Sequence, residues 1–232
     1  MPAILAEKAR ITLRDLKLIS LHSGSHIDRT NGLCVMEAAA WMAGEPHSDR
    51  PQCVCPVIGA FMRSWNDALP SNEDRDRLLK PLAKTILNTN ATREIELTRA
   101  MLCVNWYIRV WLTEWLALVP ALDKRAEAIR KLNPLQTWDD VREVMTALNK
   151  AKSDAEAARS AARSAAWSAA WSAAWSSACS AAWSAAWSSA ESAAWSAAES
   201  SARSAAESAL KPSTLLLQDS AVDLVKRMCA VK

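Results

Sequence analysis

A repeat with a period of four residues dominates the C-terminal part of this 232-residue chain. From Arg159 to Glu207, every fourth position carries a variable residue, followed by Ser and then by two residues that are almost always Ala. Alanine is the best helix former, serine is only slightly worse, and neither favours β-structure. The repeat therefore predicts a helix over residues 151–210, which could be straight, bent or broken.

Tryptophan occupies many of the variable positions, namely Trp167, Trp171, Trp175, Trp183, Trp187 and Trp195. Four residues of an ideal α-helix advance by about 400°, so each Trp is rotated by about 40° from the previous one. The stripe therefore winds around the helix and cannot stay on one face. We expect these Trp residues to pack in a core or in a homo-oligomer interface. The alternative is an exposed ladder that stacks on single-stranded nucleic acid, although such grooves normally interleave basic residues.

The remaining composition is also typical of a helical protein. The chain has only 4 Gly, 9 Pro, one Tyr and one Phe, so turn residues and aromatic strand formers are few. We expect an all-α fold in which a helical body at residues 1–150 is organised around or packed by the repeat helix at 151–210. A C-terminal helix over 211–232 would dock on this body, and the three parts would form one integrated domain.

Apolar periodicity and capping residues place the helices of the body. Ser71 and Thr137 are typical helix caps, and Gly44 is typical of a helix end. Residues 9–22 fit either a short helix or a strand. Helices are expected over residues 33–43, 57–69, 92–119 and 121–132, and also after Ser71 and after Thr137.

The terminal amphipathic helix should start at Ser213 or Thr214, just after Lys211-Pro212. Its apolar residues are predicted to dock on the body. They are Leu215, Leu216, Val222, Leu224, Val225 and Met228.

Charge and cysteine usage argue against several classes of protein. The net charge of +3 with mixed signs does not favour nucleic-acid binding. The N-terminus has no long apolar core after a basic start, so no signal peptide is expected. The 6 Cys show no regular framework, which favours free thiols in the cytoplasm. The charge-free run 164–190 contains no Leu, Ile or Val, so membrane insertion is not expected.

Polar residues are densest in the loop after Gly44 and on the helix that follows it. Loops between short helices commonly build ligand pockets. We therefore expect any ligand-binding site to involve His26, Glu37, Glu45, His47, Asp49, Arg63, Asn66 and Asp67.

A zinc site is the alternative for the same region, because it also holds all 3 His of the chain. Imidazole, carboxylate and thiolate groups suit zinc. The ligands would come from His22, His26, His47, Asp49 and Cys53. The spacing is irregular, since Gly24 separates the first two histidines and Cys53-x-Cys55 is not a CxxC motif.

The enzymatic alternative is a hydrolase built on this region, with or without zinc. Cys34 or Cys53 would serve as nucleophile with a histidine as base, or Glu37 would act as general base. The sequence contains no phosphate-binding loop, dinucleotide fingerprint or metalloprotease motif. No cofactor other than zinc is suggested.

One block of sequence resembles a known group of proteins. It comprises GLCVMEA at residues 32–38, WMAGEPHSD at 41–49 and WNDALP at 65–70. Followed by a long alanine-rich tail, this block is similar to a group of bacteriophage and actinobacterial proteins with no established activity. The resemblance implies no site residue or cofactor. We expect a non-enzymatic binding protein, such as a phage or bacterial accessory factor that sequesters a small ligand or a partner protein.

Overall fold

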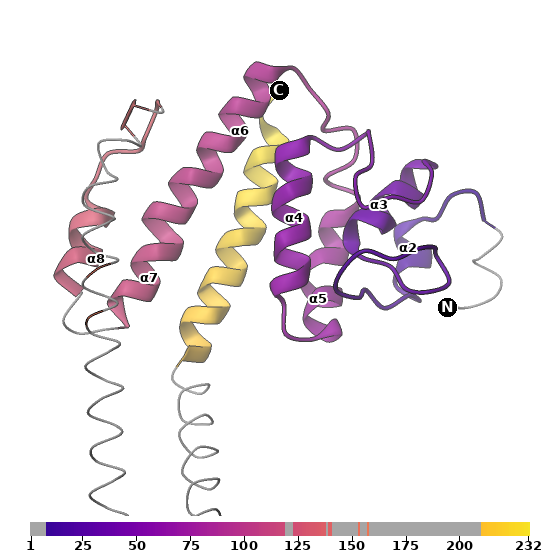
Figure 1. The fold of residues 1–232 in the computed structure, drawn as a ribbon, viewed down its shortest axis with the longest axis horizontal. Coiled ribbons are helices and arrows are strands. Elements are labelled where there is room, and N and C mark those ends of the chain that lie inside the picture. Colours follow the sequence, from indigo (N-terminus) through magenta and orange to yellow (C-terminus); the bar gives the residue numbers. More distant parts are fainter. Residues whose placement is uncertain (1–7, 119–122, 138, 141–152, 154–156, 158–209) are drawn as a thin grey trace, which may run out of the picture. The chain divides into compact units, whose positions relative to one another are not determined.

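The computed structural model describes residues 8–118, 123–137, 139–140, 153, 157 and 210–232 (Figure 1). Across these residues all regular secondary structure is helical, which confirms the all-α prediction. Within the same ranges, no helix has the length and apolar character that a membrane span requires. The Trp residues of the repeat, from Trp167 to Trp195, lie outside the described residues, so their packing stays a prediction.

The chain divides into two compact units. The first consists of Met1–Tyr107 together with Gln218–Lys232, and the second is Ile108–Leu217. Every predicted ligand-binding and zinc-binding residue belongs to the first unit. The predicted division at residues 150 and 210 stays a prediction.

Helix α2 (Leu13–Leu16) shows that the segment over residues 9–22 forms a short helix and not a strand. Thr12 and Asp15 form a capping box at its start. The Thr12 hydroxyl accepts a hydrogen bond from the Asp15 N–H, and the Asp15 carboxylate accepts one from the Thr12 N–H. This reciprocal pair satisfies two backbone donors that a helix N-terminus otherwise leaves free.

Helix α3 (Val35–Ala43) lies at the centre of the core of the first unit, and every residue from Val35 to Trp41 is buried. It ends at Gly44, which has a φ of 76° in the left-handed region. The Arg10 side chain occupies the space that a Cβ at this position would need. Only glycine satisfies both conditions, so the helix ends where the sequence predicts.

Helices α4 (Pro56–Ala68) and α5 (Asn72–Ala83) follow as a pair. The Ser71 hydroxyl caps α5 by accepting the Asp74 N–H, as predicted. The buried Arg75 of α5 donates from Nε to the Asn66 carbonyl at 2.7 Å and from Nη2 to the Leu69 carbonyl at 2.6 Å. Its guanidinium thereby satisfies carbonyl groups at the C-terminal end of α4, where a positive charge is favourable.

The long helix expected over residues 92–119 is interrupted by a π-helical turn. It is observed as α6 (Arg93–Trp106), the π-helix η1 (Tyr107–Trp111) and α7 (Leu112–Ala117). A π-helical turn holds more residues than an α-helical turn and therefore shifts the side chains that follow it around the axis. The boundary between the two compact units falls at this turn.

In the second unit, α8 (Asp123–Arg130) packs against α7. Arg130 donates to the Thr113 carbonyl at 3.3 Å and to the Glu114 carboxylate at 3.1 Å. After α8, the predicted capping residues Thr137 and Asp140 bond to each other. The Asp140 carboxylate accepts the Thr137 N–H at 2.9 Å, and the Thr137 hydroxyl accepts the Asp140 N–H at 3.2 Å.

Among the described residues the C-terminal helix covers 210–230, so Lys211 and Pro212, which were expected to precede it, are part of the helix. In Figure 1 the part of this yellow helix that belongs to the first unit, residues 218–230, lies beside α4 and α6. Its docking face includes three of the predicted residues in the core, Leu224, Val225 and Met228, and Val222 packs against that core.

The docking prediction is wrong for two residues. Leu215 is 45% exposed and Leu216 is 47% exposed. Side chains on one helix face recur every three or four residues, and Leu217, Ala221, Leu224 and Met228 follow that spacing. Leu215 and Leu216 do not lie on this face.

Arg99 of α6 attaches the end of the C-terminal helix to the body. This buried side chain donates to the carbonyls of Met228 at 2.8 Å and Val231 at 2.9 Å, and also to that of Thr89. These acceptors include carbonyls that have no partner inside a helix, so the guanidinium acts as a C-terminal cap supplied from another helix.

Candidate functional site

Glu37 is the centre of a buried polar cluster at the start of α3. Its side chain is 1% exposed. One carboxylate oxygen accepts the His26 N–H at 2.6 Å, and the other accepts the Cys34 N–H at 2.7 Å and contacts His26 Nδ1 at 2.8 Å. The Cys34 sulfur in turn accepts the Glu37 N–H at 3.4 Å, so the two residues form a capping box at the start of α3. Three donors on one carboxylate make Glu37 the attachment point of the preceding loop.

His26 and His47 meet at Glu37, and we refer to these three residues as the Glu37 cluster. His47 Nε2 lies 3.0 Å from the His26 carbonyl oxygen and 3.6 Å from a Glu37 oxygen. Since a carbonyl oxygen can only accept, His47 Nε2 must carry the hydrogen. Nδ1 of His47 is buried and has no hydrogen-bond partner among the described residues.

Gly32 allows the His26 ring to reach Glu37. Its φ is 134°, and a Cβ at this position would lie 2.5 Å from Cδ2 of His26. Both the backbone conformation and the close approach of the ring require glycine. The loop is thus folded so that the imidazole fits between Gly32 and α3.

A second polar group, Asn66 and Asp67 on α4, holds the backbone near His22. Asn66 Nδ2 donates to the His22 carbonyl at 2.9 Å, and the Asp67 carboxylate accepts the Gly24 N–H at 2.7 Å. Asn66 Oδ1 also accepts the Val35 N–H at 3.3 Å. Asn66 is buried, and its bonds tie the loop, α3 and α4 together. The predicted ligand-binding role of Asn66 and Asp67 therefore competes with a structural one.

Glu45 closes the loop between α3 and α4. Its carboxylate accepts the Gln52 N–H at 2.6 Å and the Cys53 N–H at 2.8 Å. Burial raises the pKa of Glu45, but the bonds from the Cys53 thiol and from these two N–H groups outweigh burial, so the pKa lies below its ordinary value. Glu45 is thus held as a carboxylate by the loop that it closes.

Arg29 connects the first loop to the same region. Its guanidinium carbon lies 4.7 Å from the centroid of the Trp41 ring, within the range of a cation–π contact. Its Nη2 donates to the Glu45 carbonyl at 3.4 Å. No sequence pattern pointed to this pairing, because the partners are separated along the chain and meet only in the fold.

The predicted zinc ligands do not meet at one point. The His22 ring lies edge-on to the His26 ring, with the centroids 6.0 Å apart, and the other ligands belong to three hydrogen-bonded groups. His26 and His47 meet at Glu37, Cys53 bonds to Glu45, and Asp49 pairs with Arg63. Among the described residues, no three His, Cys, Asp or Glu side chains are grouped so that they could hold a metal ion.

The cysteines proposed as nucleophiles are poorly activated. Burial raises the pKa of the Cys34 thiol to about 12. Burial followed by the bond to the Glu45 carboxylate raises the pKa of Cys53 to about 11. Both thiols therefore remain protonated near neutral pH, whereas the thiolate is the reactive form.

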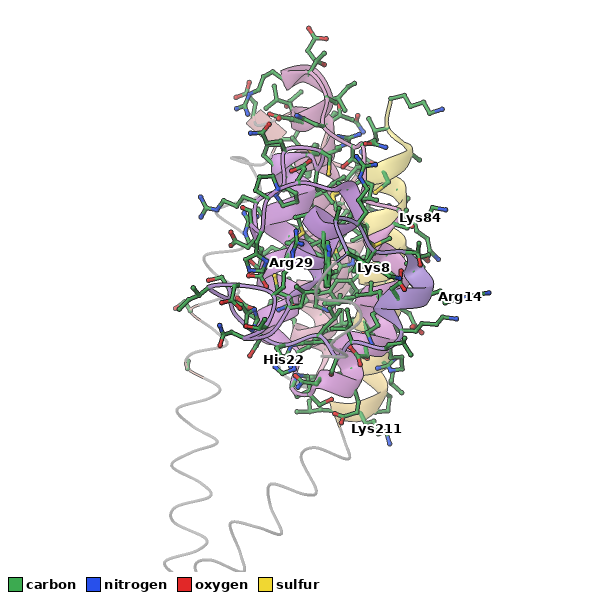
Figure 2. All side chains as sticks on the ribbon, turned by 90° about the vertical axis from the view of Figure 1, so that its right-hand side faces the viewer. Lys8, Arg14, His22, Arg29, Lys84 and Lys211 are labelled. Atoms are coloured by element: carbon green, nitrogen blue, oxygen red, sulfur yellow. The ribbon has the colours of Figure 1, made fainter. Side chains whose placement is uncertain are left out.

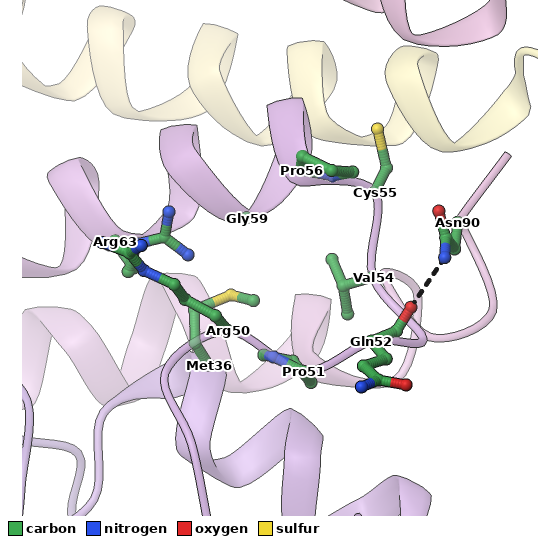
Figure 3. Close-up of a pocket in the computed structure, with 10 residues that line it drawn as sticks. All are labelled: Met36, Arg50, Pro51, Gln52, Val54, Cys55, Pro56, Gly59, Arg63 and Asn90. Atoms are coloured by element: carbon green, nitrogen blue, oxygen red, sulfur yellow. Dashed lines mark hydrogen bonds between the residues drawn. The ribbon is translucent and has the colours of Figure 1, made fainter. Parts of the chain in front are cut away.

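A cavity of about 430 Å³ opens where the loop before α4 meets α3 and the start of α4 (Figure 3). Its lining is largely apolar, but two arginines belong to it. The lining residues are Met36, Arg50, Pro51, Gln52, Val54, Cys55, Pro56, Gly59, Arg63 and Asn90.

The loop that lines the cavity is held by hydrogen bonds to the segment after α5. The N–H groups of Thr89 and Asn90 both donate to the Cys53 carbonyl, at 3.0 Å and 3.2 Å. Asn90 Nδ2 donates to the Gln52 carbonyl at 2.9 Å, as the dashed line in Figure 3 shows. The Thr89 hydroxyl accepts the Cys55 N–H at 3.1 Å. These bonds fix the loop backbone, so the cavity is a formed feature of the fold.

Comparison with protein families, curated proteins and solved structures found no match. The chemistry of the site must therefore be inferred from its own residues.

Of the predicted ligand-binding residues, only Arg63 lines the cavity. Arg63 Nη1 donates to the Asp49 carbonyl at 3.0 Å, and its Nε lies 3.9 Å from the Asp49 carboxylate. The sequence prediction missed Arg50 and Gly59. A glycine inside a helical pattern was the available signal, because such a residue often marks a close packing or binding position.

Proposed function

We propose that this chain is a non-enzymatic binding protein that holds a small ligand in the cavity of its first unit. The cavity itself is the observation that carries this proposal. Its volume of about 430 Å³ lies within the range of known small-molecule sites, and its lining combines buried apolar residues with a few polar groups. Met36, Val54 and Gly59 are buried and supply the apolar part.

Binding is favoured over catalysis by the way the reactive side chains are used. The Glu37 carboxylate already accepts hydrogen bonds from three donors. The thiols of Cys34 and Cys53 have pKa values raised to about 12 and about 11. These groups make structural contacts, whereas the cavity provides space for a ligand and side chains that can donate hydrogen bonds to it.

Gly59 provides a direct test, because its missing side chain leaves room in the cavity. A Cβ at this position would lie 3.4 Å from Met36 Cε and from Arg63 Nη1, an ordinary van der Waals contact with the ends of two flexible side chains. Gly59→Ala should therefore fold well and leave most of the space open. Gly59→Leu should fill it.

The experiment is a screen of small molecules against the full chain by ligand-observed NMR, repeated with both variants. We expect a set of compounds that bind the wild-type chain and Gly59→Ala but lose at least about tenfold in affinity for Gly59→Leu. Circular dichroism confirms that the variants are folded. If no bound compound distinguishes Gly59→Leu from Gly59→Ala, the cavity is not a ligand site and the proposal is wrong.

A further inference from the structure

The identity of the charged residues around the cavity indicates what kind of ligand it takes. Resting on the proposed function, we propose that the ligand is a small anion, with a carboxylate or phosphate head group bound by Arg50 and Arg63 and an apolar body in the cavity. Arginine binds both head groups with paired hydrogen bonds.

Arg50 is the more available of the two arginines. Its side chain is exposed at the cavity, and it makes no hydrogen bond or ion pair within the described part of the chain. Two hydrogen bonds hold the backbone beside it, because the Arg50 N–H donates to the Ser48 hydroxyl at 3.0 Å and the Asp49 carbonyl accepts Arg63 Nη1 at 3.0 Å. The free Arg50 guanidinium can bind an anion without breaking any existing contact.

Arg63 enters the same cavity from α4. In Figure 3 the two arginine side chains lie at the same end of the cavity, away from Pro56 and Asn90. Both side chains line the same cavity, so one anionic head group at that end would accept hydrogen bonds from both arginines. This arrangement favours a single head group at that end.

Two acids of the same loop, Glu45 and Asp49, do not line the cavity. Asp49 is the ion-pair partner of Arg63, at 3.9 Å, which is long for a hydrogen bond. Glu45 accepts hydrogen bonds from the backbone of Gln52 and Cys53. Neither acid lines the cavity, so the cavity presents cationic donors without a carboxylate among its lining residues.

The start of α4 adds to the positive potential. Cys55 and Pro56 line the cavity, and the N-cap Cys55 makes no side-chain capping bond. The N-terminal end of a helix carries a partial positive charge. On the apolar side, Met36, Val54 and Gly59 are buried and suit an aromatic or branched aliphatic group.

Matched probes test the charge requirement on the full chain. Benzoate and phenyl phosphate carry the proposed head groups on an apolar ring, and benzamide is a neutral analogue of similar shape. We expect both anions to bind at least about tenfold more tightly than benzamide, and more weakly as salt is added.

Arg50→Gln should lower the affinity for both anions by about tenfold and leave benzamide unaffected. Arg14→Gln is the matched control, because it removes the same charge from an exposed side chain that extends away from the body in Figure 2. Arg63→Lys tests the second contact while keeping its charge. This variant should lower the affinity for phenyl phosphate by a smaller factor than Arg50→Gln does.

The outcomes separate this inference from the proposed function. If benzamide binds as tightly as the anions, or if Arg50→Gln acts no differently from Arg14→Gln, the anionic class is wrong. In that case, probes that still lose affinity in Gly59→Leu would show that the cavity binds neutral ligands. If no probe or screened compound depends on Gly59, both proposals are wrong.

Discussion

The Glu37 cluster and the cavity both contain polar side chains, yet they differ in how those side chains are partnered. At Glu37 a buried carboxylate receives three hydrogen bonds from the chain itself. At the cavity the Arg50 guanidinium has no partner within the described residues. The first arrangement fixes a loop, and the second leaves donors free for another molecule. Polar density alone therefore does not locate a binding site, since partnered and unpartnered groups look alike in sequence.

Among the variants that test this comparison, the one that removes the Glu37 carboxylate should have the largest effect on stability. Glu37→Ala would leave the His26 and Cys34 N–H groups without their acceptor in a buried site. We expect the free energy of unfolding to fall by about 3–5 kcal/mol, measured by urea denaturation.

Glu73→Ala is the matched control for this prediction, because Glu73 also lies in the first turn of a helix but is exposed. It should cost less than about 1 kcal/mol. Similar losses for the two variants would mean that Glu37 does not organise the loop.

A smaller loss should follow from Gly32→Ala, which pushes the His26 ring away from Glu37. The left-handed backbone and the contact with the ring should together cost about 2–3 kcal/mol in thermal or urea unfolding. Gly24→Ala shares the positive φ, at 79°, but a Cβ there would meet nothing within 4 Å. It should cost only about 1–2 kcal/mol. Equal costs would show that the packing of His26 is unimportant.

The contribution of Glu45 to stability should depend on pH, and its effect should be smaller than that of Gly32→Ala. Its pKa is lower in the folded chain than its ordinary value of 4.5. The stabilisation it provides is therefore present above pH 4.5 and is lost as the pH falls through the folded pKa. Wild type should exceed Glu45→Gln in stability at pH 7 by less than about 1 kcal/mol, and this difference should shrink at pH 3. A difference that stays constant between the two pH values would contradict the pKa shift.

Arg50→Gln should have the smallest effect on stability. An exposed side chain without a partner contributes little, so the free energy of unfolding should change by no more than about 0.5 kcal/mol. The same variant is expected to lose affinity for anions. A large loss of stability would mean that Arg50 has a structural role, and the contrast with Glu37 would disappear.

Much of the fold could be predicted because it depends on local chemistry. The helix ends at Gly44, Ser71 and Thr137 follow from backbone geometry and short-range capping, and they lie where the sequence places them. The π-helical turn at Tyr107–Trp111 was not predicted, since an α-helical pattern and a π turn share the same residues. The sequence did not distinguish the buried Leu224 from the exposed Leu215, because that difference depends on which face of the C-terminal helix packs against the body.

The candidate site was harder to predict because its contacts join distant segments. Sequence grouped Glu37, His47 and Asn66 as ligand residues, whereas the fold bonds each of them to backbone or side chains of the chain. Arg63, which the sequence also grouped with them, lines the cavity, and its role in binding stays a prediction. Arg50 was missed because nothing in its neighbourhood along the chain shows that it lacks a partner.

By itself, the sequence determined the helical class of the described residues and most of their helix ends, because propensity and capping act over a few residues. Only the tertiary structure decided which polar groups are satisfied and which remain free. Hydrogen-bond partners such as Glu37 with His26, or Arg99 with Met228, come from separate parts of the chain. The cavity beside Arg50 exists because packing of α3 and α4 leaves space over Gly59, where no side chain fills it.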